Sequence, residues 1–180
     1  LIIHQINNKV DGIVIFGTTG EAPTLELEEK FKLLNGLKTI LEDYPEYKEK
    51  IIIGFSGNST MRVINEIEMF DKYNFNNYML SAPYYNKPSQ EGLFQHYNVI
   101  MKKFKNKNFL IYNIPSRTGV NILPETLKKI CFFNKNYLGV KEASGNLEQI
   151  KQVIDLGIPT YSGDDKIAFQ VIKMGGIGVV

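Results

Sequence analysis

The chain has 180 residues, of which 43% are hydrophobic and 22% charged, and its formal net charge is +2. This is the composition of an ordinary globular protein, and the length allows one substantial hydrophobic core, so we expect a single domain over residues 1–180. The Lys and Arg residues are scattered among Asp and Glu, and the densest basic run, KKFKNKN at 102–108, falls on an expected helix end and loop. The charge pattern therefore excludes a continuous nucleic-acid-binding stripe.

Cys131 is the single cysteine, so it has neither a disulfide partner nor a second thiolate with which to hold a metal. It lies in an apolar-periodic segment, LKKICFF, and we expect it to pack within a helix in a reducing compartment. The sequence shows no secretory signal and no apolar run close to the roughly 18 residues of a membrane span. We therefore expect a soluble cytoplasmic protein that binds neither nucleic acid nor membranes.

Apolar strands and amphipathic helices alternate along the chain. Residues 1–10 have apolar positions at helical spacing with no preceding cap, so the chain is expected to begin within a helix. The long helix at 24–44 has a possible cap at Thr24. Strands are predicted at 13–17, 51–55, 77–82, 109–113, 137–141, 160–163 and from 177 onward. The remaining helices are predicted at 61–74, 91–104, 123–133, 147–157 and 166–176.

The predicted strands are apolar runs with little period-two alternation, which is typical of parallel strands covered by helices. An open doubly wound sheet of this size would usually carry a phosphate-binding loop, but GTTGE at 17–21 lacks the spacing of such loops. We therefore predict an α/β fold of the (β/α)₈ TIM-barrel class. A complete barrel takes about 250 residues, so we expect a fragment, incomplete at both ends, that lacks the first strand and the C-terminal part and is inactive alone.

Loops that follow the strands of a barrel gather on one face, so residues at strand carboxyl ends converge. The chemistry-bearing residues at these ends are Thr18, Thr19, Gly20, Glu21, Tyr84, Tyr85, Asn86, Tyr112, Arg117, Lys141, Gly163, Asp164 and Asp165. A lysine, tyrosines, hydroxyls and an arginine together suit an amine nucleophile, a proton relay and a carboxylate clamp. No metal site is expected, because His4 and His96 fall on predicted helices.

Lys141 is the residue around which this chemistry is organised. It ends the apolar run YLGVK, where burial would depress the pKa of its ammonium group and favour the nucleophilic neutral amine. The sequence leaves an alternative open, in which the side chain reaches water or pairs with neighbouring Glu142.

Other members of the set also have structural alternatives. Tyr112 could be a packed aromatic whose hydroxyl bonds to the backbone, and Arg117 could pair with a surface acid. Asp164 and Asp165 could cap the next helix, and Glu21 could order its own loop.

Five motifs resemble the dihydrodipicolinate synthase family, within the pyruvate-dependent class I aldolases that include N-acetylneuraminate lyase. They are GTTGE (17–21), PYYNKPSQEGL (83–93), YNIPSRTG (112–119), GVKEASGN (139–146) and SGDD (162–165). The resemblance runs through the whole chain in the family's order. It implies a lyase that condenses pyruvate with L-aspartate 4-semialdehyde to give 4-hydroxy-tetrahydrodipicolinate, in the diaminopimelate route to lysine.

The resemblance also implies the catalytic roles. Lys141 would form the Schiff base with pyruvate, and Tyr112 would be the acid/base, aided by Thr18. Tyr85 would complete the relay, reaching into the neighbouring subunit's site in a homo-oligomer that is a dimer of dimers. No cofactor is implied.

Four further positions are implied to bind substrate. Thr19 would hold the pyruvate carboxylate, and Arg117 would bind the carboxylate of the second substrate. Gly163 and Val180 would contribute backbone groups. Sialic-acid lyases usually carry an apolar residue at the position of Arg117, so the arginine favours a small carboxylate-bearing aldehyde. The alternatives are another pyruvate-dependent aldolase, for N-acetylneuraminate or a 2-keto-3-deoxy acid, and a non-catalytic assembly protein on this fold.

In family members that lysine inhibits, the inhibitor binds between subunits. The chain keeps Asn58 and Tyr84 of that pocket, but Arg62 stands at the acidic position, and Leu27 and Lys30 stand at the histidine positions. A guanidinium would repel the ammonium of the ligand. We therefore expect weak inhibition by lysine, or none.

Overall fold

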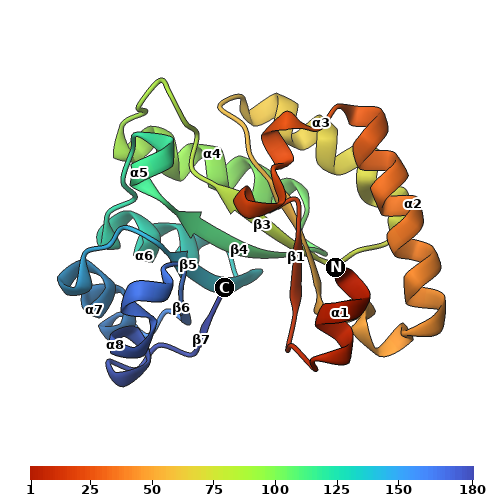
Figure 1. Cartoon of the computed structure of the whole chain (residues 1–180). Coiled ribbons are helices and arrows are strands. Elements are labelled where there is room, and N and C mark those ends of the chain that lie inside the picture. Colours follow the sequence, from red (N-terminus) through yellow and green to blue (C-terminus); the bar gives the residue numbers. More distant parts are fainter.

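The computed structural model describes all 180 residues, and its centre is one parallel seven-stranded sheet. The strands follow one another in chain order and curl into a barrel that is open on one side (Figure 1). They are β1 (Ile13–Ile15), β2 (Ile51–Phe55), β3 (Asn77–Ser81), β4 (Asn108–Asn113), β5 (Tyr137–Glu142), β6 (Thr160–Ser162) and β7 (Gly178–Val179). The predicted barrel-type α/β fold is confirmed, and all strand carboxyl ends meet at one rim.

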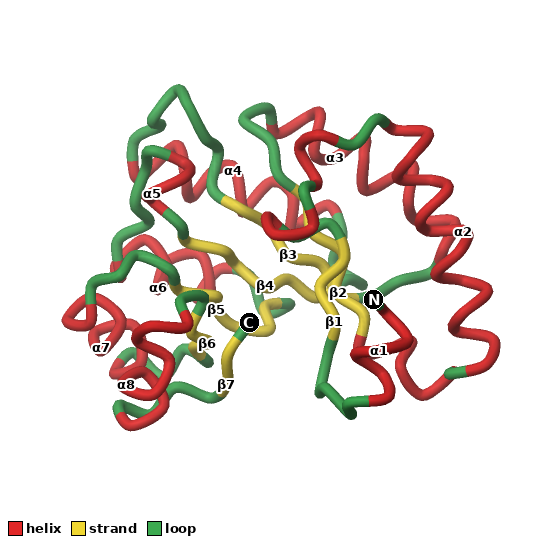
Figure 2. Tube along the Cα trace, viewed as in Figure 1, coloured by secondary structure: helices red, strands yellow, loops and turns green.

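Helices cover the outer, convex face of the sheet (Figure 2). They are α1 (Ile2–Asn7), α2 (Leu27–Asp43), α3 (Thr60–Phe70), α4 (Gln90–Lys103), α6 (Pro124–Phe133), α7 (Leu147–Asp155) and α8 (Ala168–Lys173), while the one-turn helix α5 (Pro115–Thr118) lies in the loop after β4. The main core lies between the helices and the strands. Cys131 packs there as predicted, and burial raises the pKa of its thiol to about 12. None of the helices combines the length and hydropathy that crossing a membrane requires.

The segment after β1 differs from the prediction. The strand ends at Ile15 because Phe16 has a φ of 60°, a left-handed conformation that cannot continue a β-ladder. The predicted cap at Thr24 is wrong, since Thr24 ends a 3₁₀ turn. Helix α2 instead begins with a capping box, in which the Glu26 side chain accepts from the backbone of Glu29 and the Glu29 side chain accepts from the backbone of Glu26.

Short elements at the strand ends also differ from the prediction. The loop after β4 contains the one-turn helix α5, which ends at Gly119 with a φ of 73°. The helix predicted at 166–176 is shorter, because a 3₁₀ turn over Asp165–Ile167 precedes α8. The Asp164 side chain accepts a hydrogen bond from the backbone N–H of Lys166 at 3.0 Å, which confirms Asp164 as a cap.

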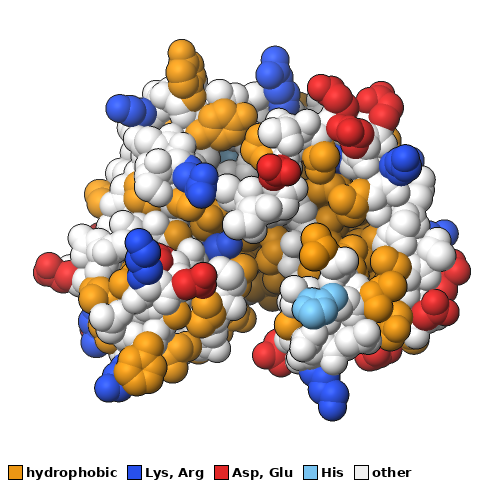
Figure 3. Space-filling model, viewed as in Figure 1, with side chains coloured by type: hydrophobic (Ala, Val, Ile, Leu, Met, Phe, Trp, Pro, Cys, Tyr) orange, Lys and Arg blue, Asp and Glu red, His pale blue; other side chains and the backbone are white.

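Strands β1 and β7 do not pair, and a cavity of about 880 Å³ opens between them. Figure 3 shows this hollow between the lobe with α1 and the lobe with α7 and α8. The interior of the sheet beside it holds a small apolar cluster of Met79, Leu110, Tyr112 and Ile114. The barrel interior is thus accessible from this side.

His96 on α4 gives the stability a predictable pH dependence. Its ring is 5% exposed, Nδ1 lies 2.9 Å from Oγ1 of Thr60, and burial lowers the pKa of the ring to about 4. The unfolded chain takes up this proton below about pH 6.5, whereas the folded chain does so only near pH 4. The His96 contribution to the free energy of unfolding is therefore complete above pH 6.5 and is lost as the pH falls. We expect about 2 kcal/mol of loss between pH 7 and pH 5.

Urea unfolding of wild type and His96→Gln across this pH range checks the expectation. The stability difference between the two proteins should shrink as the pH falls. Parallel stability curves would contradict it.

Candidate active site

Lys141 lies near the carboxyl end of β5, and its side chain is half-buried. Its Nζ is 4.4 Å from the centre of the Tyr112 ring, on the adjacent strand β4, where Tyr112 is its register partner. Lys141 takes part in none of the five ion pairs of the chain, so the alternative pairing with Glu142 is wrong. Burial lowers the pKa of the ammonium group, and the charge of Asp165 partly opposes this. The site thus holds an unpaired amine with an increased neutral fraction.

Tyr112 is 4% exposed and faces the barrel interior with Lys141. Burial raises the pKa of its hydroxyl, while a hydrogen bond with the Thr18 side chain and the positive charge of Arg117 act in the opposite direction. The ring is packed among apolar side chains, as the structural alternative expected, but the partner of the hydroxyl is the Thr18 side chain and no backbone group. The phenol is therefore protonated at neutral pH, with the Lys141 amine over its ring and Thr18 as the partner of its hydroxyl.

Arg117 is an exposed residue of α5, and no carboxylate of the chain pairs with it. The alternative of a surface ion pair is wrong. Its charge still acts on the Tyr112 hydroxyl, so the guanidinium lies on the same side of the barrel. A guanidinium without an ion-pair partner can bind a carboxylate through two parallel hydrogen bonds.

Gly163 packs directly against the stem of Lys141. A Cβ at this position would lie 3.0 Å from Cε and 3.1 Å from Cγ of Lys141, and 2.9 Å from Cβ of Ala143. The backbone N–H of Gly163 donates to the carbonyl of Glu142 at 2.8 Å. Any larger residue would therefore displace the lysine side chain.

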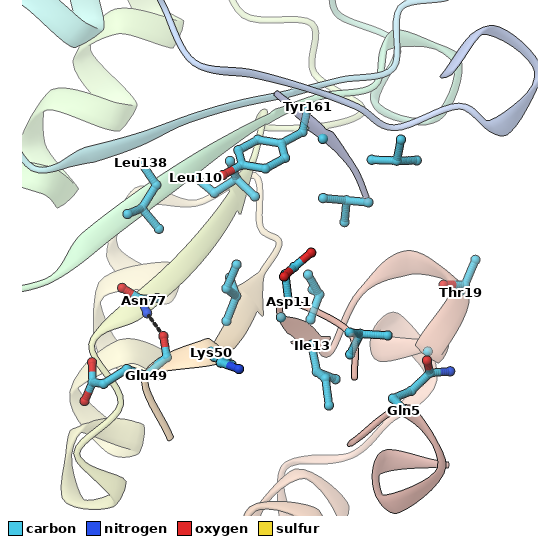
Figure 4. Close-up of a pocket in the computed structure, with 18 of the residues that line it drawn as sticks. Gln5, Asp11, Ile13, Thr19, Glu49, Lys50, Asn77, Leu110, Leu138 and Tyr161 are labelled. Atoms are coloured by element: carbon cyan, nitrogen blue, oxygen red, sulfur yellow. Dashed lines mark hydrogen bonds between the residues drawn. The ribbon is translucent and has the colours of Figure 1, made fainter. Parts of the chain in front are cut away.

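Thr19 and Val180 line the open cavity together with Tyr161 (Figure 4). The side chains of Lys141 and Tyr112 do not line it, and lining residues such as Asp11, Lys50 and Asn77 lie before strands or at their amino ends. The cavity therefore opens mainly at the other end of the barrel from the rim that carries the amine. Sequence analysis did not single out Tyr161, which lies in the middle of β6.

Tyr85 lies away from the other predicted catalytic residues. Its side chain is 84% exposed and has no hydrogen bond within the chain, and its backbone is left-handed with a φ of 75°. The backbone N–H donates to the carbonyl of Thr118 at 3.1 Å, which holds the loop against α5. The chain itself does not bring Tyr85 to Lys141.

Sequence analysis also missed a buried polar cluster behind the lysine. We call it the carboxyl–amide cluster; its members are Asn113, Asn121, Glu142 and Gln149. Asn113 and Glu142 directly follow Tyr112 and Lys141 at the ends of β4 and β5, and both are fully buried. A buried carboxylate next to the candidate nucleophile is unusual, because desolvation penalises charge.

Comparisons with known proteins identify the family of the chain. A curated relative from a Cyanothece species, 4-hydroxy-tetrahydrodipicolinate synthase, is 40% identical over 98% of this chain and 60% of its own. The structure of that enzyme from Methylacidiphilum fumariolicum SolV matches with a TM-score of 0.90 and 40% identity, over 99% of this chain and 59% of its own. A chloride-inhibited dihydrodipicolinate synthase from Acinetobacter baumannii, complexed with pyruvate, matches with a TM-score of 0.89 and 34% identity, over 99% and 60%.

The chain thus spans about 60% of the length of these relatives. A family model described as the dihydrodipicolinate synthetase family matches residues 1–180. The order of the strands, the site at their carboxyl ends and the full length of this match lead to one conclusion. The chain belongs to the dihydrodipicolinate synthetase family.

Proposed function

We propose that the protein at its natural length is a Schiff-base-forming lyase that condenses pyruvate with L-aspartate 4-semialdehyde. The product would be 4-hydroxy-tetrahydrodipicolinate, on the diaminopimelate route to lysine. The observation that carries the proposal is the unpaired, half-buried amine of Lys141 at 4.4 Å from the ring of buried Tyr112. The pyruvate complex of the Acinetobacter baumannii relative supports the first substrate.

The chemistry starts from the neutral amine of Lys141. It attacks the ketone carbon of pyruvate, and loss of water from the resulting carbinolamine gives an iminium that accepts electrons. A proton then leaves the methyl carbon, and the enamine adds to the aldehyde carbon of the second substrate. The amino group of that substrate displaces Lys141 from the imine carbon, which closes the ring and frees the enzyme.

Tyr112 and Thr18 serve as the proton relay in this sequence. A phenol and a hydroxyl both donate and accept protons without adding negative charge beside the iminium. The raised pKa of Tyr112 keeps its proton available for the departing water. Tyr85, exposed in this chain, would join the relay of a neighbouring subunit in a homo-oligomer.

Arg117→Ala tests the identity of the second substrate. Removing the guanidinium should leave the pyruvate adduct on Lys141 nearly intact. It should weaken transition-state binding of aspartate semialdehyde by about 1.5 to 3 kcal/mol, or roughly 10- to 150-fold in kcat/KM. Steady-state kinetics, with each substrate varied in turn, measure the separate effects on pyruvate and on aspartate semialdehyde.

Arg62→Ala, which changes an exposed arginine on α3, is the matched control and should retain wild-type values. If Arg117→Ala slowed formation of the pyruvate adduct as much as the reaction with aspartate semialdehyde, the assignment of Arg117 would be refuted. An unchanged kcat/KM would point to an aldehyde without a carboxylate.

Feedback by lysine is expected to be weak. Lys30 pairs with Glu66, with Nζ 2.6 Å from Oε1, so the repulsion of a bound ammonium group rests on Arg62, which has no such partner. Lysine titrated at subsaturating pyruvate should not inhibit in the sub-millimolar range. Inhibition in that range, roughly −4 kcal/mol of binding or better, would contradict the expectation. Arg62→Glu should increase the sensitivity.

A further inference from the structure

The carboxyl–amide cluster lies on the opposite side of β5 from the amine. Successive residues of a strand point to opposite faces, and Lys141 faces the interior with Tyr112. Glu142 therefore faces the helices, where it meets Gln149 of α7. Its side chain is fully buried and takes part in no ion pair. A buried carboxylate without a cation is costly, so its hydrogen bonds must hold it.

Every group that contacts the Glu142 carboxylate is a donor. Nδ2 of Asn113 lies 3.2 and 3.1 Å from its two oxygens, the backbone N–H of Ser144 lies at 2.8 Å, and Nε2 of Gln149 lies at 3.4 Å. The Asn113 amide cannot be reversed, since its Oδ1 accepts from the backbone N–H of Ile122 at 3.0 Å. The position therefore requires an acceptor on both oxygens, which a carboxylate provides and a glutamine does not.

The cluster holds both ends of the segment that carries Arg117. This segment, residues 114–122, leaves β4 after Asn113 and returns to it at Ile122, which bonds to the Asn113 amide through its N–H and its carbonyl. Nδ2 of Asn121 donates to Oε1 of Gln149 at 2.7 Å, and Oδ1 of Asn121 accepts from Nε2 of Gln149 at 3.1 Å. The same Oδ1 accepts from Nδ2 of Asn113 at 2.9 Å. Hydrogen bonds thus run from Glu142 through Asn113 and Gln149 to this segment.

We propose that Glu142 is a positioning residue, whose carboxylate fixes the Arg117 segment against the strand that carries Lys141 and so sets the distance between the amine and the guanidinium. The inference rests on the proposed function, because that distance matters only if both groups act on one reaction. Glu142 touches no substrate in this account. It governs recognition of the second substrate's carboxylate and leaves the amine's own chemistry unchanged.

Glu142→Gln is the direct test, because it keeps the shape and places an NH₂ group against donors. In the protein at its natural length, the rate of pyruvate adduct formation on Lys141 should stay within roughly threefold of wild type. The KM for aspartate semialdehyde should rise roughly tenfold or more. Glu125→Gln, an exposed glutamate in the first turn of α6, is the matched control and should change neither value.

Further variants separate positioning from a loss of stability. The variant that combines Arg117→Ala with Glu142→Gln should have the same KM for aspartate semialdehyde as Arg117→Ala alone. Once the guanidinium has been removed, its position no longer matters. If Glu142→Gln does not fold, Asn121→Ala should likewise raise the KM for aspartate semialdehyde while leaving the rate of pyruvate adduct formation nearly unchanged.

The outcomes are distinct. Additive losses in the double variant, or equal losses in adduct formation and in KM, would overturn the positioning role while leaving the proposed function standing. Absence of any Lys141 adduct in the wild-type protein would overturn the proposed function, and the inference with it.

Discussion

Lys141→Ala should abolish the pyruvate adduct and lower kcat by roughly 10⁴-fold or more, the size of effect seen when a covalent nucleophile is removed. The reason is geometric and electrostatic together. Lys141 is an unpaired amine whose ammonium pKa burial lowers, and its Nζ lies 4.4 Å from the ring of Tyr112. Lys141→Arg should fail equally, because a guanidinium stays protonated and cannot form an imine. Steady-state kinetics of both variants provide the measurement.

Lys173→Ala, at an exposed position of α8, is the matched control and should behave as wild type. Substantial turnover by Lys141→Ala would show that another group attacks pyruvate, or that the reaction needs no Schiff base.

Tyr112→Phe should cost roughly 10² to 10⁴ in rate, the usual contribution of a general acid/base. The substitution keeps the ring beside Lys141 and removes only the hydroxyl, on which Thr18 and the charge of Arg117 act. Both the loss of water from the carbinolamine and the loss of the methyl proton should slow. Pre-steady-state adduct formation and steady-state turnover together measure the effect.

Tyr137→Phe at the opposite end of β5 changes a tyrosine far from the rim and should leave both rates unaltered. Wild-type rates in Tyr112→Phe would exclude Tyr112 as the acid/base and leave the relay to Thr18.

The sequence predicted the strands well because their signal is local. An apolar run such as IIIGF can be buried on both faces only in a covered parallel sheet, and β2 has the predicted bounds of Ile51–Phe55. The ends of elements were predicted less well. Phe16 adopts a positive φ and Glu26 caps α2, and neither residue type is the usual choice for that conformation or position.

Convergence at the rim was also predictable, since parallel strand order alone brings Thr18, Tyr112 and Lys141 together. The carboxyl–amide cluster was not predictable, because Asn121 and Gln149 are common polar residues whose roles depend on orientation across three segments. The resemblance implies that Tyr85 reaches into a neighbouring subunit, and its side chain is exposed in this chain. The sequence has no signal that would predict where this side chain lies within one chain.

The most direct test of the Schiff-base mechanism is chemical trapping. The protein at its natural length is incubated with pyruvate, reduced with borohydride, digested and analysed by peptide mass. We expect a reduced pyruvate adduct on the peptide that contains Lys141, because its unpaired amine next to Tyr112 is the site's nucleophile. An unmodified Lys141, or an adduct on another lysine, would contradict the account.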